Sequence, residues 1–503
     1  MPTATGRAKV AIDMKDLDGL RGVAAIWIVI FHSFYYSRLP NINFQGSTLM
    51  PLFFLLSGFS MAIGYHNRLF PNTEIQNVRH VAIIPKAENP ALEEGTLASP
   101  ENAATIGDSQ PQGKNSTTND SVSSPLGKYF YNRLIRVIPV YYICTCEAIP
   151  PTLYGYGNFN PRSQFSMVSG FVQSFIPTST WTLFLIGIPL DGPGWTIATL
   201  YFFWICFPWL LKHYQIKSDE ELLNSIVRCY WIQLFIIVIL YPVFLIFGLG
   251  SLAFWVPTAF PPCRLPVFIM GMNAGLLCLR YANSDTIPWF AQSGSFLPWN
   301  FWIWNCCGSS KVSSSSASSS SSDKPNSSTC LSCFHHLISF DCNFQNTCLQ
   351  QSIKLVCLTF LWTLLTGLVG DIGSNAWFQG INVFAQLDLI VGLVRINGTS
   401  LCSKVLRNPV IQWYGEISMA LYLVHEPLIY YFCWFQNGFK ELKWPSDMNC
   451  SSDDDSSCQD TLDDFNYDKQ MQSWGIVTIL PIATCLAALL YYGVEEPTRK
   501  YFK

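Results

Sequence analysis

The sequence has few charged residues. Only 13% of its 503 residues are Asp, Glu, Lys or Arg, whereas 50% are hydrophobic. Because a soluble domain contains about 25% charged residues, a water-soluble protein of this size would struggle to cover its surface. The net charge of −3 says little about partners, and a nucleic-acid partner is not expected.

The sequence also lacks a regular cysteine pattern. Its 18 cysteines are unevenly spaced, which argues against a small disulfide scaffold. Cys450 and Cys458 are candidates for one disulfide in a loop outside the membrane. The segment CLSCFHHLISFDC (330–342) contains residue types that bind zinc, but a lone CxxC beside a serine tract also suits reduced or lipidated cysteines. We therefore predict no metal site.

Long apolar runs dominate the rest of the chain. They are roughly 18–25 residues long, the length that crosses a bilayer core of about 30 Å. We predict an all-α, multi-pass transmembrane helical bundle with about ten spans. The stretch 168–190 is broken by prolines and is interpreted as a re-entrant loop, with an eleventh span as the alternative. The predicted spans are 22–38, 47–65, 137–153, 195–211, 229–249, 253–279, 353–370, 378–394, 410–432 and 473–493.

Lys and Arg residues near the span ends predict the orientation. With the N-terminus in the cytosol, Lys15, Lys212, Arg407 and Arg499 all fall on the cytosolic side, and the acidic loop 433–472 falls outside. An even number of spans places both termini in the cytosol. The sequence leaves open whether the membrane is an endomembrane or the plasma membrane.

Two insertions hold too few apolar residues to fold alone, and we predict that both are disordered and cytosolic. The first is rich in Asn, Ser, Pro, Glu and Gly, and the second is nearly a serine run. The predicted divisions are a cytosolic tail (1–16), the first two spans (17–69), a disordered insertion (70–127), the continued membrane domain (128–307), a Ser-rich insertion (308–349) and the C-terminal part of the membrane domain (350–503).

The first span contains two basic residues, Arg21 and His32. They are eleven residues apart, which is just over three helical turns and about 16 Å, so both lie on nearly the same helix face. Ionisable groups at membrane depth are costly and usually face a polar interior. The pair predicts a pathway from the cytosol into the membrane.

Further ionisable residues lie within predicted spans. Arg264 is the most costly and needs a carboxylate or an anionic ligand, for which Asp388 is a candidate. So many buried polar groups predict an enclosed polar cavity. Arg133 and Arg136 share a face at the cytosolic mouth of the third span and suit a phosphate-bearing ligand. The predicted supporting residues inside the membrane are Arg264, Asp388, Glu416 and Glu426.

Five motifs together resemble the acyltransferase 3 family of integral membrane acyltransferases. They are LDGLRG…FH (17–32), FFLLSGF (53–59), RLIRVIPVYY (133–142), RLPVFIMGM (264–272) and WYGEISMALYLVHEPL (413–428). The resemblance implies transfer of an acyl group, most simply acetyl, from cytosolic acyl-CoA as co-substrate, with no tightly bound cofactor. The implied acceptor bears a hydroxyl group and is a carbohydrate or a lipid on the lumenal or outer side, or within the membrane lipid.

The resemblance also assigns roles to residues. His32 is the expected general base, and His425 is expected to position the acceptor or take part in proton transfer. The expected donor-binding residues are Arg21, Arg133, Arg136, Ser57 and Gly58.

One position departs from the family pattern. The stretch WTIATLYFFW (195–204) has Leu200 where the family has a glutamate. Glu147, Glu416 or Glu426 are candidates to compensate for this loss. The absence of the glutamate keeps open a transporter or lipid-handling protein on the same fold. A non-catalytic scaffold is a further alternative, but it leaves the Arg21–His32 pair without a purpose.

Overall fold

The computed structural model is helical throughout the residues that it describes: 12–37, 46–70, 124–156, 164–181, 190–282, 380, 382–396, 401–442 and 470–502. The predicted insertions, the predicted span 353–370, the candidate zinc segment and the candidate Cys450–Cys458 disulfide lie wholly or almost wholly outside these ranges. The helices are α1 (Lys15–Tyr35), α2 (Met50–Leu69), α3 (Pro125–Leu153), α4 (Gln164–Phe175), α5 (Gly194–Tyr214), α6 (Asp219–Phe235), α7 (Tyr241–Ile246), α8 (Gly250–Ala259), α9 (Pro261–Arg280), α15 (Val383–Ile396), α16 (Leu401–Leu406), α17 (Pro409–Gln436), α19 (Ser473–Leu490) and α20 (Glu496–Tyr501).

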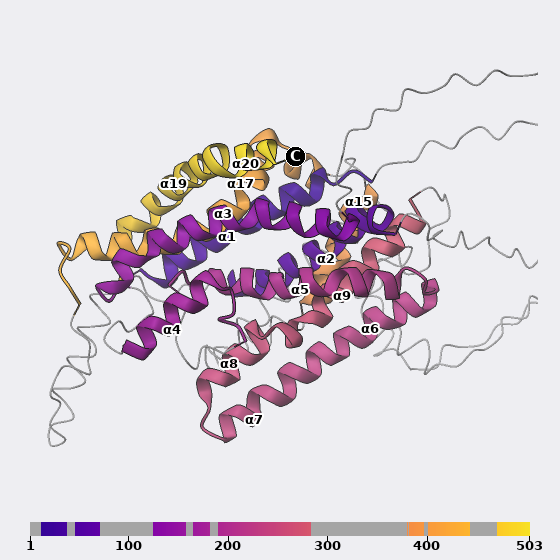
Figure 1. Cartoon of the computed structure of the whole chain (residues 1–503), viewed down its shortest axis with the longest axis horizontal. Helices are drawn as coiled ribbons and strands as arrows, with labels where there is room; N and C mark the ends of the chain where they lie inside the picture. The colour runs from indigo at the N-terminus through magenta and orange to yellow at the C-terminus, as the bar shows by residue number, and fades with distance from the viewer. Residues whose placement is uncertain are drawn as a thin grey trace, which may run out of the picture.

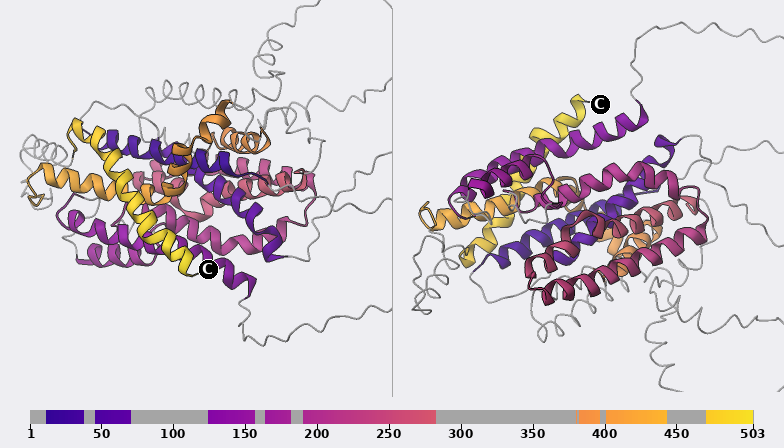
Figure 2. Two further views of the ribbon diagram at one scale, coloured as in Figure 1. Left: turned by 90° about the horizontal axis from the view of Figure 1, so that it is seen from above. Right: turned by 60° about the horizontal axis from the view of Figure 1, so that its bottom comes forward.

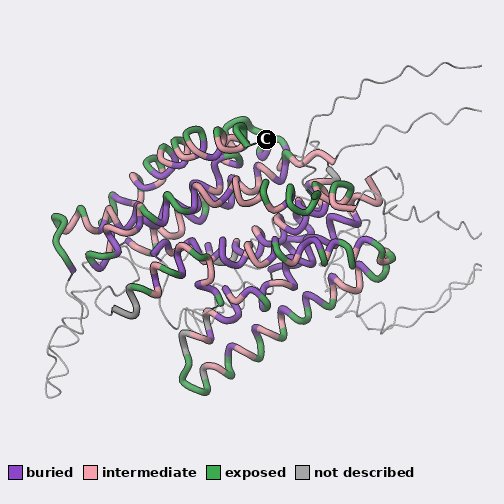
Figure 3. The backbone as a smooth tube through the Cα atoms, viewed as in Figure 1, coloured by how far each residue is buried: buried purple, intermediate pink, exposed green. Residues whose placement is uncertain are grey.

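Most of the long helices lie along the long axis of the molecule (Figures 1 and 2). Helices α1, α3, α17 and α19 form one half of the bundle, and α2, α5, α6 and α9 form the other half. Buried residues gather between the two halves, whereas α19 and α6 expose their outer faces (Figure 3). This distribution is typical of a helical membrane domain, in which apolar side chains also cover the outside.

Five helical segments of the described part are long and apolar enough to cross a membrane. They are Lys15–Tyr35, Gly194–Tyr214, Asp219–Phe244, Trp255–Arg280 and Ser473–Tyr501. The total of about ten spans stays a prediction. Within the stretch 168–190, helix α4 has 12 residues, well below the roughly 20 that a spanning helix needs.

Three helices begin well before the apolar runs indicated, and one of them is α6, which begins at Asp219 rather than at residue 229. Helix α1 begins at Lys15 rather than at residue 22, and α3 begins at Pro125 rather than at residue 137. In α3, the Ser124 side chain caps the helix by accepting a hydrogen bond from the Gly127 N–H, and proline is favoured in the first turn. Hydropathy follows the apolar part of a helix, whereas the cap decides where the helix starts.

Glycines pack α1 closely against α17. A Cβ atom at Gly22 would lie 2.6 Å from the Gly415 nitrogen and 2.8 Å from the Ile411 oxygen. A Cβ atom at Gly415 would overlap with the Asp18 carbonyl, and one at Gly19 with that of Leu406. The glycines of the LDGLRG motif and of the last motif therefore face each other, which small residues permit in membrane helices.

A second glycine-mediated pair joins α2 to α9. A Cβ atom at Gly58 would overlap with the Phe268 carbonyl, and one at Gly271 with the Leu55 carbonyl. A Cβ atom at Gly275 would lie 2.8 Å from the Phe59 carbonyl oxygen. The expected donor contact of Gly58 is therefore corrected: the backbone of α9 fills the space beside it, and Gly58 mediates helix packing.

Candidate active site

Two histidines from distant parts of the chain meet inside the bundle. Nδ1 of His32 on α1 lies 2.7 Å from Nε2 of His425 on α17, and the two rings are stacked with centroids 4.9 Å apart. His425 is fully buried, whereas His32 is half-buried. The pair is therefore one hydrogen-bonded unit with a single partly accessible imidazole.

Helices α1 and α17 run in the same direction, because contacts progress together along both. Arg21 contacts Gly415 near the start of each helix, His32 then meets His425, and Tyr36 reaches Glu426 beyond them. Two parallel helices begin on the same side of a membrane. The predicted orientation likewise places the beginnings of these two spans on one side of the membrane.

Glu426 is held next to the histidine pair by two tyrosines. The hydroxyl groups of Tyr36 and Tyr430 donate to Oε1 of Glu426 over 2.7 and 2.6 Å. Sequence reasoning missed both tyrosines, although each lies four residues after a predicted site residue and so on the same helix face. The hydrogen bonds compensate part of the cost of burying the Glu426 carboxylate.

The side chains of His32, His425 and Glu426 are of the types that bind divalent metals, and their ligand atoms all lie within 4.8 Å of one another. Two nitrogens bound to one tetrahedral zinc are about 3.3 Å apart, given zinc–nitrogen bonds of about 2.0–2.1 Å. The observed 2.7 Å between the histidines is instead a hydrogen-bond distance. The geometry fits a proton-carrying pair better than a metal centre.

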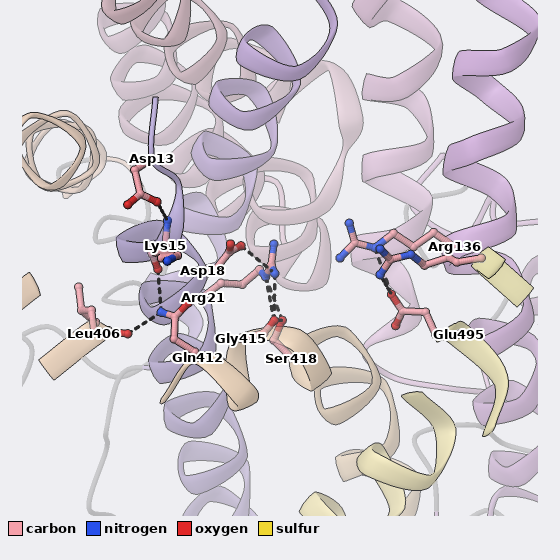
Figure 4. A network of polar contacts seen from close by, with 11 residues as sticks. Asp13, Lys15, Asp18, Arg21, Arg136, Leu406, Gln412, Gly415, Ser418 and Glu495 are labelled. Atoms are coloured by element: carbon pink, nitrogen blue, oxygen red, sulfur yellow. Dashed lines mark hydrogen bonds and ion pairs between the residues drawn. The ribbon is translucent and has the colours of Figure 1, made fainter. Parts of the chain in front are cut away.

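Arg21 joins the beginnings of α1 and α17. Its Nη2 donates to the Gly415 carbonyl at 2.9 Å and its Nε to the Ser418 hydroxyl at 3.0 Å (Figure 4). Nη2 also forms an ion pair with Asp18 at 3.1 Å. Most of the hydrogen-bonding capacity of this guanidinium therefore stabilises the helix pair that positions the histidines.

Arg133 and Arg136 lie on α3, and Arg136 interacts electrostatically with Arg21. Arg136 Nε donates to the Glu495 carboxylate at 3.1 Å (Figure 4), and Glu495 is buried. The Arg133 guanidinium lies 5.1 Å from the ring centroid of Tyr65, and its buried Nε makes no hydrogen bond within the described part of the chain. Arg133 therefore keeps at least one N–H donor for a ligand.

The other predicted residues are dispersed. Ser57 is half-buried and its Oγ lies 3.5 Å from Sδ of Met61 on the same helix. Arg264 is fully buried and donates from Nε to the Thr258 carbonyl at 2.8 Å. Asp388 is also buried, but the ion pairs among the described residues do not join it to Arg264. Glu416 is exposed on α17, so it does not line the interior as predicted.

Leu200 packs against the apolar core from α5. Of the three glutamates named as possible replacements for the missing carboxylate, Glu426 is buried beside the histidine pair, Glu147 is half-buried and Glu416 is exposed. Glu426 is therefore the one of the three that the structure brings next to both histidines.

Comparison with known proteins relates the beginning of the chain to one family. Residues 14–86, which include α1 and α2, match the model of an acyltransferase domain, that of the acyltransferase 3 family. The match confirms the family that the motifs predicted, and together with the apolar helices it supports an integral membrane protein. No curated protein and no solved structure matches the chain.

Proposed function

We propose that the protein is an integral membrane acyltransferase that moves an acyl group, most simply acetyl, from cytosolic acyl-CoA to a hydroxyl group of an acceptor. The acceptor is a carbohydrate or lipid that arrives from the lumenal or outer side or from the bilayer. The single observation that carries the proposal is the 2.7 Å hydrogen bond between His32 and His425 in the interior of the bundle.

The surroundings of the histidine pair favour one arrangement of protons. The carbonyl oxygens of Leu421 and Tyr422 lie beside His425, whose buried Nδ1 makes no standard hydrogen bond with the described residues. Because carbonyl oxygens only accept, we assign a proton to Nδ1 of His425. Its Nε2 then accepts from Nδ1–H of His32, which leaves the lone pair on Nε2 of His32.

This arrangement gives each histidine a role in acyl transfer. Nε2 of His32 takes the proton of the acceptor hydroxyl while the hydroxyl oxygen attacks the thioester carbonyl, and His425 orients the His32 ring. Collapse of the tetrahedral intermediate breaks the carbon–sulfur bond, and the proton on His32 passes to the departing CoA thiolate. The ester and CoA are the products, and the base returns to its starting state.

The arginines supply the donor end of the proposed site. Arg133, with its buried Nε free of described partners, and Arg136 present guanidinium groups suited to the phosphates of CoA. Arg21 contributes positive charge nearby while it holds α1 on α17. The pantetheine arm is long and thin, and it would extend from these arginines toward His32.

Release of CoA from acetyl-CoA by the purified full-length protein in detergent tests the proposal. The wild type should release CoA slowly to water and faster with an acceptor, whereas His32→Ala should lose both activities. A family member that keeps the glutamate serves as the positive control. If that control is active and the wild type neither releases CoA nor binds acetyl-CoA, the transporter or lipid-handling alternative replaces the enzyme.

A further inference from the structure

A buried carboxylate lies in the turn before α5, outside the set of residues discussed so far. Asp191 is only 1% exposed, and neither of its carboxylate oxygens has a hydrogen-bond partner among the described residues. A buried polar group without a partner is costly, so such a group in a folded protein requires an explanation. A ligand that supplies the missing hydrogen bonds is one such explanation.

The turn that contains Asp191 packs on the histidine site. A Cβ atom at Gly192 would lie within 2.5 Å of the Glu426 carboxylate, and Glu426 directly follows His425 in α17. Tyr422, one turn before Glu426, interacts electrostatically with both Asp191 and Glu426. The unpartnered oxygens therefore belong to the same polar region as the two imidazoles.

The charges around Asp191 define what it can bind. Burial raises the pKa of Asp191 well above its usual range, and the carboxylates of Glu426 and Glu147 act in the same direction. A hydroxyl group can donate to an ionised carboxylate and can also accept from a protonated one. A hydroxyl therefore satisfies Asp191 in either state, whereas an acyl-CoA phosphate would be repelled.

We propose that Asp191 is an acceptor-positioning residue that hydrogen-bonds a hydroxyl group next to the one that His32 activates. This inference rests on the proposed acyltransferase function and names the acceptor class: molecules with neighbouring hydroxyl groups, as in sugars and other polyols. Glu426 supports the same region, because both tyrosine hydroxyls donate to its Oε1 while the carboxylate faces Gly192.

Two surrogate acceptors of equal size test this inference. Ethane-1,2-diol and 1-propanol each have four heavy atoms, but only the diol has a second hydroxyl group for Asp191. Purified full-length protein is given radiolabelled acetyl-CoA with either alcohol at the same concentration, and the labelled ester is counted. The wild type should acylate the diol about tenfold faster, because the second hydroxyl adds one hydrogen bond to Asp191.

The variants separate positioning from a structural role. Asp191→Ala and Asp191→Val should lower the ratio of diol to propanol acylation to about one. Each of these two substitutions removes a buried polar group that has no partner. A variant that folds should therefore have a melting temperature equal to or above that of the wild type in the same detergent. Asp191→Asn retains hydrogen-bonding atoms and should recover much of the ratio. Glu147→Gln, a matched change at a nearby carboxylate, should keep the full ratio.

Two failures can be told apart. If the wild type releases no CoA from acetyl-CoA, the proposed function fails and this inference fails with it. If CoA is released but the wild type shows no preference for the diol, or if Asp191→Ala and Asp191→Val keep that preference, only the inference is overturned. A lower melting temperature with equal loss of both ester products would likewise assign Asp191 a structural role.

Discussion

In the described part of the chain, the α1–α17 and α2–α9 pairs are both packed through glycines, and the α1–α17 contact carries a hydrogen-bonded histidine pair. The α2–α9 pair brings Gly58 against the Phe268 carbonyl. Near this contact, the ring of Phe54 on α2 packs against the ring of Phe203 on α5. The α1–α17 pair brings Gly22 against Gly415 and places the His32–His425 hydrogen bond along the same contact. Close packing is common to both pairs, so glycine motifs alone do not mark the site.

Close packing through glycines therefore has two roles in this protein, helix association and the alignment of polar side chains. In α2–α9 the close approach gains van der Waals contact, which drives helix association inside a bilayer. In α1–α17 it also brings side chains from the two ends of the sequence within hydrogen-bonding distance. The comparison predicts that damage to α2–α9 lowers stability, whereas damage to α1–α17 lowers activity as well.

The largest expected effect is that of His32→Ala. Loss of the general base should lower kcat for acyl transfer by about 10²–10⁴-fold, while the half-buried position limits any loss of stability. The assay is CoA release in the presence of acceptor, with Gly64→Ala as a control on α2, where a Cβ atom meets nothing within 4 Å. Wild-type turnover in His32→Ala would contradict the role of the pair as catalytic base.

The next effect is that of Arg21→Ala, which removes the hydrogen bonds to Gly415 and Ser418. Hydrogen bonds that involve a charged group each contribute about 1.5–3 kcal/mol, so we expect a clear decrease in melting temperature together with lower kcat. Arg21→Lys should not restore either property, because a single ammonium cannot reach both partners as the guanidinium does. A variant with normal stability and only a raised KM for acyl-CoA would instead favour a donor-binding role.

Alanine at the packing glycines compares the two helix pairs directly. Gly58→Ala and Gly22→Ala should each lower the free energy of unfolding by about 1–3 kcal/mol, because overpacking forces the backbones apart. Thermal unfolding in detergent measures this change. Activity per folded molecule should fall in Gly22→Ala but stay near wild type in Gly58→Ala. Equal activity in both variants would remove the distinction between the pairs.

Gly64→Ala tests the glycine argument on a single helix. It lies on α2 with Gly58, but it has open space around it. Since alanine favours helices over glycine, the substitution should raise stability by about 0.5–1 kcal/mol, opposite in sign to Gly58→Ala. A loss similar to that of Gly58→Ala would mean that helix packing does not explain the cost at Gly58.

A separate effect is expected at the donor end. Arg133→Ala should raise the KM for acetyl-CoA about tenfold with little change in kcat, since one charge-assisted hydrogen bond to phosphate is lost. Binding should also become less sensitive to salt, because fewer charges take part. Arg228 on α6, away from this group of arginines, provides the matched control as Arg228→Ala. An unchanged KM in Arg133→Ala would remove the donor phosphates from this position.

The local part of the site was predictable from sequence. Arg21 and His32 lie on one helix at a fixed spacing, and the last motif contains His425 and Glu426, so their chemistry follows from short segments. The positions of Tyr36 and Tyr430 were not predicted, although their i+4 spacing from His32 and Glu426 is a usable signal. No such signal marks Asp191, because the turn that precedes its apolar helix resembles many other turns in sequence.

By itself, the sequence determined the helical membrane class, pointed to the acyltransferase 3 family and named His32 and His425 as candidate reacting groups. The length of an apolar run and the spacing of residues are local properties, so both can be determined without knowledge of the fold. Only the tertiary structure decided that Arg21 donates a hydrogen bond to the Gly415 carbonyl, that Gly58 lies in a helix–helix contact and that His32 is hydrogen-bonded to His425. These partners lie far apart in the chain, 393 residues in the case of the histidines. Nothing in a single sequence specifies which helix faces pack together, and that pairing is what makes the separate residues one site.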